Sequence, residues 1–472
     1  FEQRVTKNYP KLEYTVQYRE SDLDFVLRMM AHYGISFYFK HQSGSHKLVL
    51  ADGPSSYDEV PGGSREFKST EDQIRSDEEH FHRWIPERRF TSGKVTTLDY
   101  NHKKPTQDMK GEKTGDAEYD HGELEVYDYP TKNLDKGEGT DFAKLRLNML
   151  RSQDNHHMAS GNCLGLSPGM TVTLEKHPTD RFNTEYLTLA ASHSYVSESY
   201  TSGHGDGGTA AYEGGYEFIT ADTPIAPEEK IKAPSVMGPQ TAVVVGSGEI
   251  DCDDEGRILV RFHWDREKTN SMRCRVSQIW AGKGWGHIAL PRVGMEVIVE
   301  FIEGDPDRPL VTGCVYNGDN KAPFDLPGKK NISGIKSNST EGGGGYNELV
   351  FDDTKGDELF RQHAQYDMET KVLNDERREI NGNQTLTVIK NRNTEVHEHD
   401  NLDVTKTLTM TANQQIKLKV GQSTITMTPD KITIEALNVE VKAKAQLDTA
   451  GTLVNHKATA LMTIKGMPIK IN

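Results

Sequence analysis

The sequence predicts a mainly β protein with some α-helix, in which an α+β region precedes a small barrel and a long β-structured tail. Three observations carry this prediction. Helical spacing of apolar residues is confined to the first part of the chain, short strand-like runs gather in its middle, and apolar and polar residues alternate through its C-terminal part. A length of 472 residues suits about three domains.

Composition and charge exclude several classes of protein. The chain carries 56 lysines and arginines against 71 aspartates and glutamates, a formal charge of -15, so nucleic acid is not an expected partner. No apolar stretch is long enough to span a membrane, and the start at Phe1 lacks the pattern of a signal peptide, so Sec-type export is not indicated. The absence of a CxxC pair predicts small buried thiols in a reducing cytosol, without disulfides or zinc. The four cysteines are Cys163, Cys252, Cys274 and Cys314.

Residues 1–235 are predicted to form the α+β region. Ser21 and Asp24 fit a capping box at the start of a helix. That helix is indicated by apolar residues at helical spacing, which are Leu23, Val26, Leu27 and Met30. A second helix is predicted over Asp141–Arg151, and the proline-spaced segment Thr223–Pro234 is predicted to be a linker.

Residues 236–320 are predicted to form an OB-fold barrel. Five short apolar runs fall within this stretch, and turn residues such as those in DDEG and GDPDRP separate them. A polar connector, residues 321–347, is predicted to follow. Its glycines Gly342–Gly345 lack the GK[ST] of a phosphate-binding loop, so a hinge is the favoured interpretation.

Residues 348–472 alternate apolar and polar side chains, with turn residues recurring between the clusters. The apolar edge of such a ribbon needs cover, yet the tail offers no helix and too few bulky residues to build a core alone. We therefore expect three copies to wind about one axis, with apolar side chains inside and open strand edges paired between chains. The residues predicted to form this trimer core are Leu402, Val404, Leu408, Met410, Ile416, Leu418, Ile425, Met427, Ile432, Ile434, Val439 and Val441.

Four stretches stand out as longer motifs. They are YTVQYRESDLDFVLRMMAHYGISFYF at Tyr14–Phe39, YDYP at Tyr127–Pro130, the run from WAGKGWG to TGCVYN at Trp280–Asn317, and GGGGYNELVFDDTKGDE at Gly342–Glu358. Together they resemble the VgrG family, the spike proteins of the type VI secretion system, and the resemblance covers essentially the whole chain. It implies an N-terminal part similar to the hub of contractile phage tails, an OB-fold similar to the base of the phage spike, and a C-terminal triple-stranded β-helix needle formed by a trimer. Family members usually begin before the residues seen here, so the front of the hub is expected to be missing.

The resemblance also implies a structural role. Members of the family are homotrimers that cap a tube of hexameric haemolysin-coregulated protein, carry a PAAR-type tip protein, and associate with baseplate components and effector proteins. On this basis the protein is expected to assemble in the cytoplasm and to be injected through a target membrane without a signal peptide. No enzymatic activity, cofactor or bound metal is expected.

The alternative reading is a phage or phage-like tail spike or baseplate hub protein, with or without a cell-wall hydrolase domain outside this chain. The segment between Asn317 and Gly342 is too short for a lysozyme domain. Continuation beyond Asn472 into an effector domain is not expected, while a natural protein that is longer at its C-terminus stays an open alternative. A carbohydrate-binding fibre is disfavoured because the tail lacks an aromatic platform for sugars.

Two motifs mimic functional loops. Gly165–Gly169 satisfies the G-x-S-x-G pattern of a hydrolase, but a strand-like run follows Ser167 where a nucleophile elbow needs a helix, so a turn is predicted. Asp251–Gly256 resembles the start of a calcium loop, but Phe262 stands where a bidentate glutamate is required, so a hairpin turn is predicted.

Two further motifs contain histidines. Alternate histidines in the HEHD of His397–Asp400 share one face of a strand, and three-fold symmetry would multiply them into a metal site. Their face is opposite to that of Val396, so a solvated surface is favoured, and metal binding by His397 and His399 is left open. In Ser76–Trp84, carboxylates stand beside histidines without a nucleophile, so a polar surface or an interdomain contact is predicted.

Overall fold

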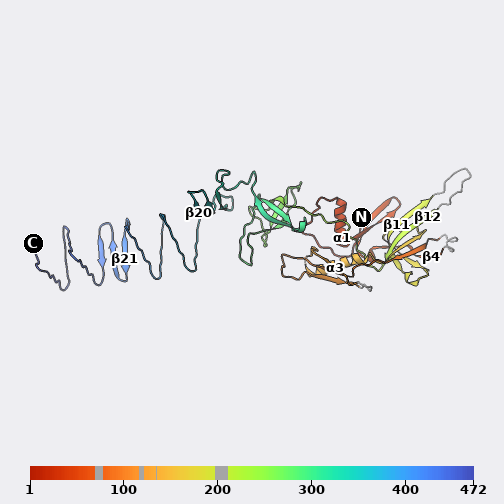
Figure 1. Ribbon diagram of the computed structural model, residues 1–472, viewed down its shortest axis with the longest axis horizontal. Helices are drawn as coiled ribbons and strands as arrows, with labels where there is room; N and C mark the ends of the chain where they lie inside the picture. Colours follow the sequence, from red (N-terminus) through yellow and green to blue (C-terminus); the bar gives the residue numbers. More distant parts are fainter. Residues whose placement is uncertain (70–77, 116–121, 134, 197–210, 472) are drawn as a thin grey trace. The chain divides into compact units, whose positions relative to one another are not determined.

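The structure is a computed structural model. It describes residues 1–69, 78–115, 122–133, 135–196 and 211–471. The chain forms two compact units, Phe1–Glu369 and Thr370–Asn472 (Figure 1). Strands dominate the described residues, and the two α-helices among them lie in the first unit. The predicted mainly β class with some α-helix is confirmed.

The N-terminal segment forms helix α1 and a three-stranded sheet. Helix α1 spans Asp22–His32, and the Oγ of its N-cap residue Ser21 accepts a hydrogen bond from the backbone nitrogen of Asp24, as the capping pattern predicts. The sheet has the order β1-β3-β2, with β1 parallel and β2 antiparallel to β3. Its strands are β1 Glu2–Arg4, β2 Ser36–Gln42 and β3 Ser45–Ala51.

A closed barrel, here called the N-terminal barrel, follows with the strand order β10-β11-β12-β9-β5-β4. Its strands are β4 Asp58–Phe67, β5 His80–Glu87, β9 His156–Gly161, β10 Met170–Glu175, β11 Glu185–Val196 and β12 Ala211–Thr220. Aromatic rings fill the interior: Trp84 stacks on Phe218 with ring centroids 5.2 Å apart, and Phe81 meets both rings edge to face. The sequence predicted an α+β region but not a closed barrel, because strands distant in the chain, such as β5 and β9, pair there.

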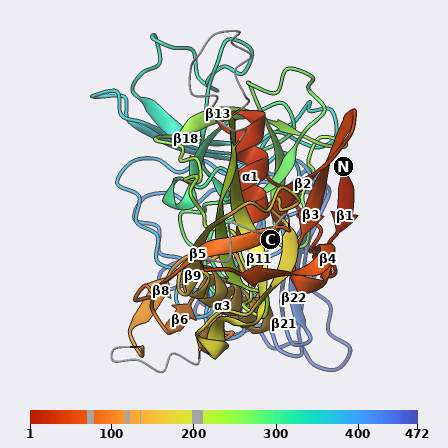
Figure 2. The same cartoon turned by 90° about the vertical axis from the view of Figure 1, so that its right-hand side faces the viewer.

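Helix α3 spans Lys136–Arg151 and packs on a smaller sheet with the order β7-β6-β8 (Figure 2). The strands of this sheet are β6 Lys94–Thr97, β7 Gly111–Thr114 and β8 Glu125–Asp128. The helix begins before the predicted Asp141, because Asp135 caps it by accepting a hydrogen bond from the first turn. In that first turn Gly139 approaches Gly111 so closely that a side chain on Gly111 would overlap the helix backbone.

The five runs predicted for the OB-fold form a closed barrel with the strand order β13-β14-β15-β17-β16, which confirms that prediction. The strands are β13 Gln240–Val245, β14 Ile258–Phe262, β15 Met272–Val276, β16 Glu296–Phe301 and β17 Pro309–Val315. Alternate residues of β14 are buried, as the period of two predicts. Short 3-10 turns precede or connect the barrel strands. They are η1 Pro54–Ser56, η2 Asp180–Phe182 and η3 Ile302–Gly304.

A three-stranded sheet with the order β18-β19-β20 follows the OB barrel. Its strands are β18 Ile332–Lys336, β19 Glu348–Asp352 and β20 Leu359–His363. The connector predicted over 321–347 therefore contains a strand. The glycines after that strand are held by hydrogen bonds: the backbone nitrogen of Gly342 donates to Glu249 at 3.2 Å, and that of Gly343 to the carbonyl of Ser339 at 3.1 Å.

The second unit carries an antiparallel sheet with the order β21-β22-β23. Its strands are β21 Ile416–Val420, β22 Ser423–Met427 and β23 Ile432–Glu435. The remaining described residues of this unit, including the clusters near Leu386, Val396, Leu402 and Leu408, form no strand within one copy. One copy supplies no neighbouring edge to those segments, so their backbone groups stay unpaired with other strands.

Candidate functional site

The sheet β21-β22-β23 gathers apolar side chains on one face. The register places Leu418 opposite Ile425, and Ile425 opposite Ile434. Ile416 and Ile432 flank Met427 in the same way. Directly opposed residues of antiparallel strands point to one side of the sheet. We call this side the needle face; its residues are Ile416, Leu418, Ile425, Met427, Ile432 and Ile434.

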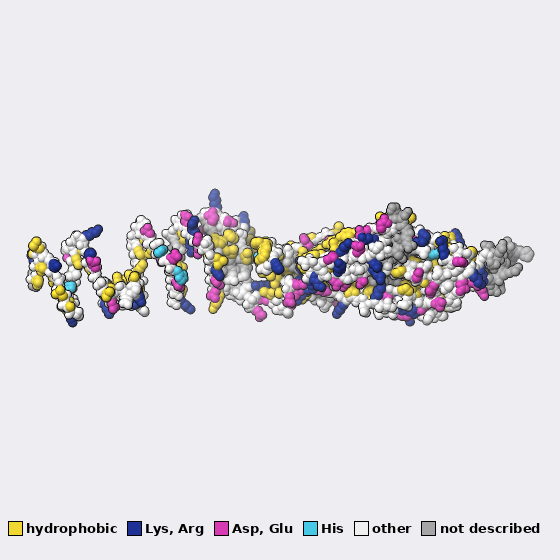
Figure 3. All heavy atoms as spheres, turned by 90° about the horizontal axis from the view of Figure 1, so that it is seen from below, with side chains coloured by type: hydrophobic (Ala, Val, Ile, Leu, Met, Phe, Trp, Pro, Cys, Tyr) yellow, Lys and Arg dark blue, Asp and Glu magenta, His cyan; other side chains and the backbone are white. Residues whose placement is uncertain are grey.

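The needle face is uncovered in a single copy (Figure 3). Ile432 is 68% exposed, Ile434 56% and Leu418 54%. The opposite face of the same sheet is polar, with Lys417 beside Thr426 and Thr426 beside Thr433. An apolar face of this kind, on a thin sheet without a second layer, is stable only when another surface covers it.

The other residues predicted for the trimer core also lie at the surface of one copy. These exposed residues are Leu402, Val404, Leu408, Met410, Val439 and Val441. They precede and follow the paired strands, in segments without strand pairing within the chain. The structure thus brings half of the predicted residues together in one sheet.

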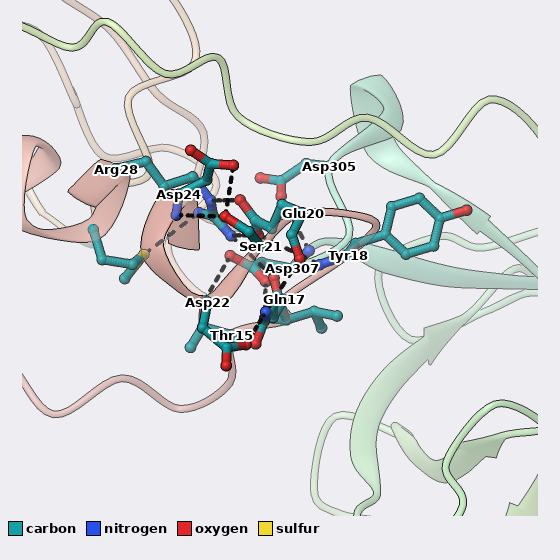
Figure 4. A network of polar contacts seen from close by, with 12 residues as sticks. Thr15, Gln17, Tyr18, Glu20, Ser21, Asp22, Asp24, Arg28, Asp305 and Asp307 are labelled. Carbon is teal, nitrogen blue, oxygen red and sulfur yellow. Dashed lines mark hydrogen bonds and ion pairs between the residues drawn. The ribbon is translucent and has the colours of Figure 1, made fainter. Parts of the chain in front are cut away.

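A second feature is the junction between the N-terminal region and the OB barrel, centred on Asp307 in the turn after β16 (Figure 4). The carboxylate of Asp307 accepts hydrogen bonds from the backbone nitrogen of Val16 at 2.7 Å and from the hydroxyl of Thr15 at 3.3 Å. The amine of Lys132 lies 2.9 Å from Asp305 and 3.3 Å from Asp307. Two acidic side chains of the OB barrel therefore bind two separate segments of the N-terminal region.

A buried ion pair fixes the segment that reaches Asp307. The guanidinium of Arg28 in α1 donates to both carboxylate oxygens of Glu20 at 2.7 Å and to the carbonyl of Val16 at 3.1 Å. Both charged side chains are only 9% exposed. The hydrogen bonds from Arg28 lower the pKa of Glu20, which keeps the carboxylate ionised. Helix α1 thereby positions the backbone that the OB barrel recognises.

Further contacts reach the OB barrel from other parts of the N-terminal region. Tyr14 packs against the apolar core of the barrel, and its burial raises its pKa to about 12. The nearly buried carboxylate of Asp99 lies 3.4 Å from Arg308. The Nε2 of His102 lies 3.2 Å from Glu255. Contacts from separate segments of the chain therefore hold the OB barrel against the N-terminal region.

The predicted linker Thr223–Pro234 is packed against the protein. The carboxylate of Glu229 lies 2.6 Å from Arg146 in α3 and 3.5 Å from His32 in α1. Ala226 is buried. The linker is therefore held by both helices at Glu229.

The two loop motifs form turns, as predicted. Strand β10 begins at Met170, directly after the motif containing Ser167, so no helix follows this serine. In the second motif the carboxylate of Asp253 accepts hydrogen bonds from the backbone nitrogens of Glu255 and Arg257, which closes a turn before β14. Neither serine elbow nor calcium loop is formed.

The motif Ser76–Trp84 differs from its prediction. Ser76 and Asp77 lie outside the described residues. His80 opens strand β5 and is buried, and its backbone nitrogen donates to the side chain of Asn162 at 2.6 Å. The prediction of a polar surface or interdomain contact is wrong for His80, because this residue is only 5% exposed and hydrogen-bonds to Asn162 and Glu78 of the same N-terminal region.

The remaining candidate ligands are scattered. His397 and His399 are exposed. Within the described ranges, histidine, cysteine and carboxylate side chains form no group of three that could hold a metal ion.

All four cysteines are free thiols. Cys163 and Cys274 are buried, as predicted, and burial raises the pKa of each to about 12. Cys252 and Cys314 are exposed, so the prediction of small buried thiols is wrong for these two.

No helix in the described part of the chain has the length and apolar character needed to cross a membrane.

Sequence reasoning missed the junction. Asp305 and Asp307 belong to the GDPDRP stretch, which the pattern indicated only as a turn. Their partners, Lys132 and Val16, stand far away in the sequence and carry no motif that links them to this turn. Two acidic residues flanking a proline in a short loop were the one available signal.

Models of three protein families match separate parts of the chain. A model described as phage tail baseplate hub matches residues 1–199, and one described as type VI secretion system/phage-baseplate injector OB domain matches residues 240–316. A model of the bacteriophage T4 gp5 C-terminal trimerisation domain matches residues 333–446, which include the needle face.

A solved E. coli protein, described as a component of the type VI secretion system similar to the T4 tail proteins gp27 and gp5, is 17% identical. That comparison covers 66% of this chain and 65% of the other, with a TM-score of 0.44.

Curated relatives share more of the sequence. The type VI secretion system spike protein VgrG1b of Pseudomonas aeruginosa is 37% identical over 82% of this chain, and the chain spans about half of it, 53%. The actin cross-linking toxin VgrG1 of Vibrio cholerae is 33% identical over 80% of this chain, but only 35% of that toxin is matched. The spike protein VgrG1a of Pseudomonas aeruginosa is 34% identical over 100% of this chain and 77% of its own length. The chain therefore belongs to the VgrG family of type VI secretion system spike proteins.

Proposed function

We propose that this chain is a structural spike of the type VI secretion system, in which three copies form a needle that penetrates a target membrane. The observation that carries the proposal is the needle face. Its six apolar residues are aligned by the register of β21, β22 and β23, and none of them is buried in one copy. The match of residues 333–446 to a trimerisation domain supports three copies as the cover.

In the proposed trimer, residues 348–472 of each copy wind about a common axis. The needle face and the further predicted core residues turn toward this axis, while the polar face with Lys417 and Thr426 meets water. Removing apolar surface from water contributes about 25 cal/mol per Å². Many such contacts along the needle, together with strand pairing between chains, make it stiff and slow to unfold.

The proposal assigns the remaining parts to transmitting force. Residues 1–235 serve as the hub and 236–320 as an OB collar, with the connector 321–347 leading into the needle. The junction at Asp307 supports this assignment, because its contacts with Val16 and Lys132 resist separation of the hub from the collar. A push on the hub then reaches the collar through these contacts as well as through the covalent chain.

The proposed partners follow from the family. The hub of the trimer caps a tube of hexameric haemolysin-coregulated protein within a baseplate, and the needle end carries a PAAR-type tip protein and effector proteins. The protein is made in the cytoplasm and leaves by injection rather than through a signal peptide. We propose no nucleic-acid partner and no cofactor.

We also propose that this chain is not an enzyme. The toxin relative carries a name that refers to actin cross-linking, but this chain matches only 35% of that protein. The G-x-S-x-G motif forms a turn before β10, which supports a structural role for this segment. Purified protein is therefore expected to leave peptidoglycan intact.

The test is the mass of the purified full chain by size-exclusion chromatography with light scattering. A trimer has a mass near three times 52.9 kDa. The same sample is expected to keep its C-terminal part intact under limited proteolysis. A monomer with a protease-sensitive tail, measured at micromolar concentration, would overturn the proposal.

A further inference from the structure

A hairpin of the OB barrel, between β15 and β16, exposes four large apolar side chains. We call it the tryptophan hairpin; it spans residues 279–288. Ile279 is 89% exposed and Ile288 76%. Trp280 is 63% exposed and Trp285 58%. So many large apolar side chains on one short hairpin indicate a surface that another molecule covers.

The hairpin is ordered by its own contacts. The backbone nitrogen of His287 donates to the carbonyl of Trp280 at 2.8 Å. The indole rings of Trp280 and Trp285 meet edge to face, with centroids 4.9 Å apart. At the base of the hairpin, the side-chain amide of Gln278 bonds both the backbone nitrogen and the carbonyl of Ala289. The exposed rings are therefore held in place before any partner binds.

The apolar side chains of the hairpin do not form a single flat face. Ile279 and Trp280 are consecutive residues, and both are more than half exposed. Consecutive side chains of an extended segment point to opposite sides of it. A flat protein surface would cover only one of these sides, whereas the headgroups and acyl chains of a bilayer surround a segment that enters them. The shape of the hairpin thus favours a lipid surface.

The charge of the hairpin favours the same partner. Residues 275–295 contain no aspartate or glutamate, although the chain carries 71 of them. Lys283 stands in the turn between the two tryptophans and is exposed. Indole and lysine side chains suit the boundary of a bilayer, because their apolar parts enter it while the indole nitrogen and the amine stay with the headgroups. Anionic headgroups therefore complement this hairpin.

We propose that the tryptophan hairpin inserts into the surface of a bilayer that contains anionic phospholipid. Trp280 and Trp285 enter the boundary between headgroups and acyl chains, and Lys283 pairs with lipid phosphates. The inference goes beyond the proposed function, in which the needle alone meets the membrane, because it gives the OB collar a lipid contact of its own.

The experiment measures flotation of the purified full chain with vesicles of equal parts phosphatidylcholine and phosphatidylglycerol. The chain is expected to float with the vesicles. The variant that combines Trp280→Ser with Trp285→Ser is expected to bind about tenfold more weakly or less, because burial of a large apolar side chain contributes at least about this factor.

Trp264→Ser is the matched control. Trp264 is 48% exposed and belongs to the same barrel, but its ring stacks on Phe262 with centroids 5.1 Å apart. This control is expected to bind vesicles like the unchanged chain. Lys283→Glu is expected to weaken binding to the mixed vesicles about tenfold and to leave binding to phosphatidylcholine alone unchanged.

Each outcome decides a question. An unchanged chain that does not float would overturn the inference and leave the trimeric needle standing. Equal flotation of the double tryptophan variant would overturn it too, because lipid binding would then belong to another part of the chain. Loss of the trimeric mass in the double variant, measured by light scattering, would assign the hairpin to contacts between copies and contradict the proposal. A monomeric mass of the unchanged chain would overturn the proposed function instead.

Discussion

The substitution Ile434→Asp tests the needle face most directly. Ile434 lies opposite Ile425 and is 56% exposed in one copy, so a trimer would bury about half of its side chain. That burial contributes about 1–2 kcal/mol per copy, or about 3–6 kcal/mol per trimer. Aspartate loses this contribution and adds three carboxylates near one axis, each of which costs several kcal/mol to remove from water. The lost burial and the cost of the three carboxylates together amount to on the order of 10 kcal/mol per trimer, which lowers the association constant by several orders of magnitude.

The assay measures two properties of the variant: its mass by light scattering, and the survival of its C-terminal part during limited proteolysis. Loss of the trimer, or rapid cleavage within the needle, is the expected result. Thr433→Asp is the matched control, since Thr433 is the preceding residue, is also exposed, and points to the polar face. An Ile434→Asp protein that stays trimeric and as protease-resistant as the control would refute the reasoning.

Three further predictions concern the first unit. Arg28→Met leaves the carboxylate of Glu20 buried without its partner and is expected to lower the free energy of unfolding by about 3 kcal/mol, measured by chemical denaturation. Burial lowers the pKa of His157 to about 4 from its ordinary 6.5, so the unfolded state binds the proton more tightly, and stability is expected to fall by about 3 kcal/mol as the pH drops from 6.5 to 4. Gly169 has a φ of +84°, and a Cβ there would overlap the ring of Tyr38, so Gly169→Ala is expected to cost more than about 2 kcal/mol in thermal unfolding.

Controls separate these effects from general damage. Arg28→Lys keeps the charge and should retain part of the stability, so equal losses for both variants would contradict the ion-pair explanation. His157→Gln should flatten the difference between pH 6.5 and pH 4; an unchanged pH dependence would assign it to other groups. Gly44 has a φ of +77° with open space around it, so Gly44→Ala measures backbone strain alone and should cost less than Gly169→Ala.

The sequence predicted those parts of the fold whose determinants are local. The OB strands could be predicted because alternation and turn residues specify each one separately, as in β14 with its alternate buried residues. The capping of α1 by Ser21 could be predicted from Ser21 and Asp24, which stand three positions apart in the sequence. The needle face could be predicted from alternation as well, because direct opposition of Ile425 and Ile434 follows once short turns join successive strands.

The parts that were missed depend on contacts between distant residues. The start of α3 was placed too late because glycines in its first turn lower the helix propensity of that segment. The reason for a glycine there is the close approach of Gly139 to Gly111, a contact between distant residues that the sequence does not show. Strand β18 was missed because its polar neighbours suggested a connector and its pairing partner β19 comes later in the chain. The contact of Asp307 with Val16 joins two loops whose sequences carry no common pattern.

The packing of Glu229 against Arg146 and His32 bears on where foreign cargo could be grafted. An insertion at that point would separate the partly buried carboxylate of Glu229 from Arg146 and His32, and would detach this segment from the two helices that it contacts. Protein engineers who wish to add a passenger domain therefore have reason to avoid residues 223–234 and to choose exposed turns elsewhere.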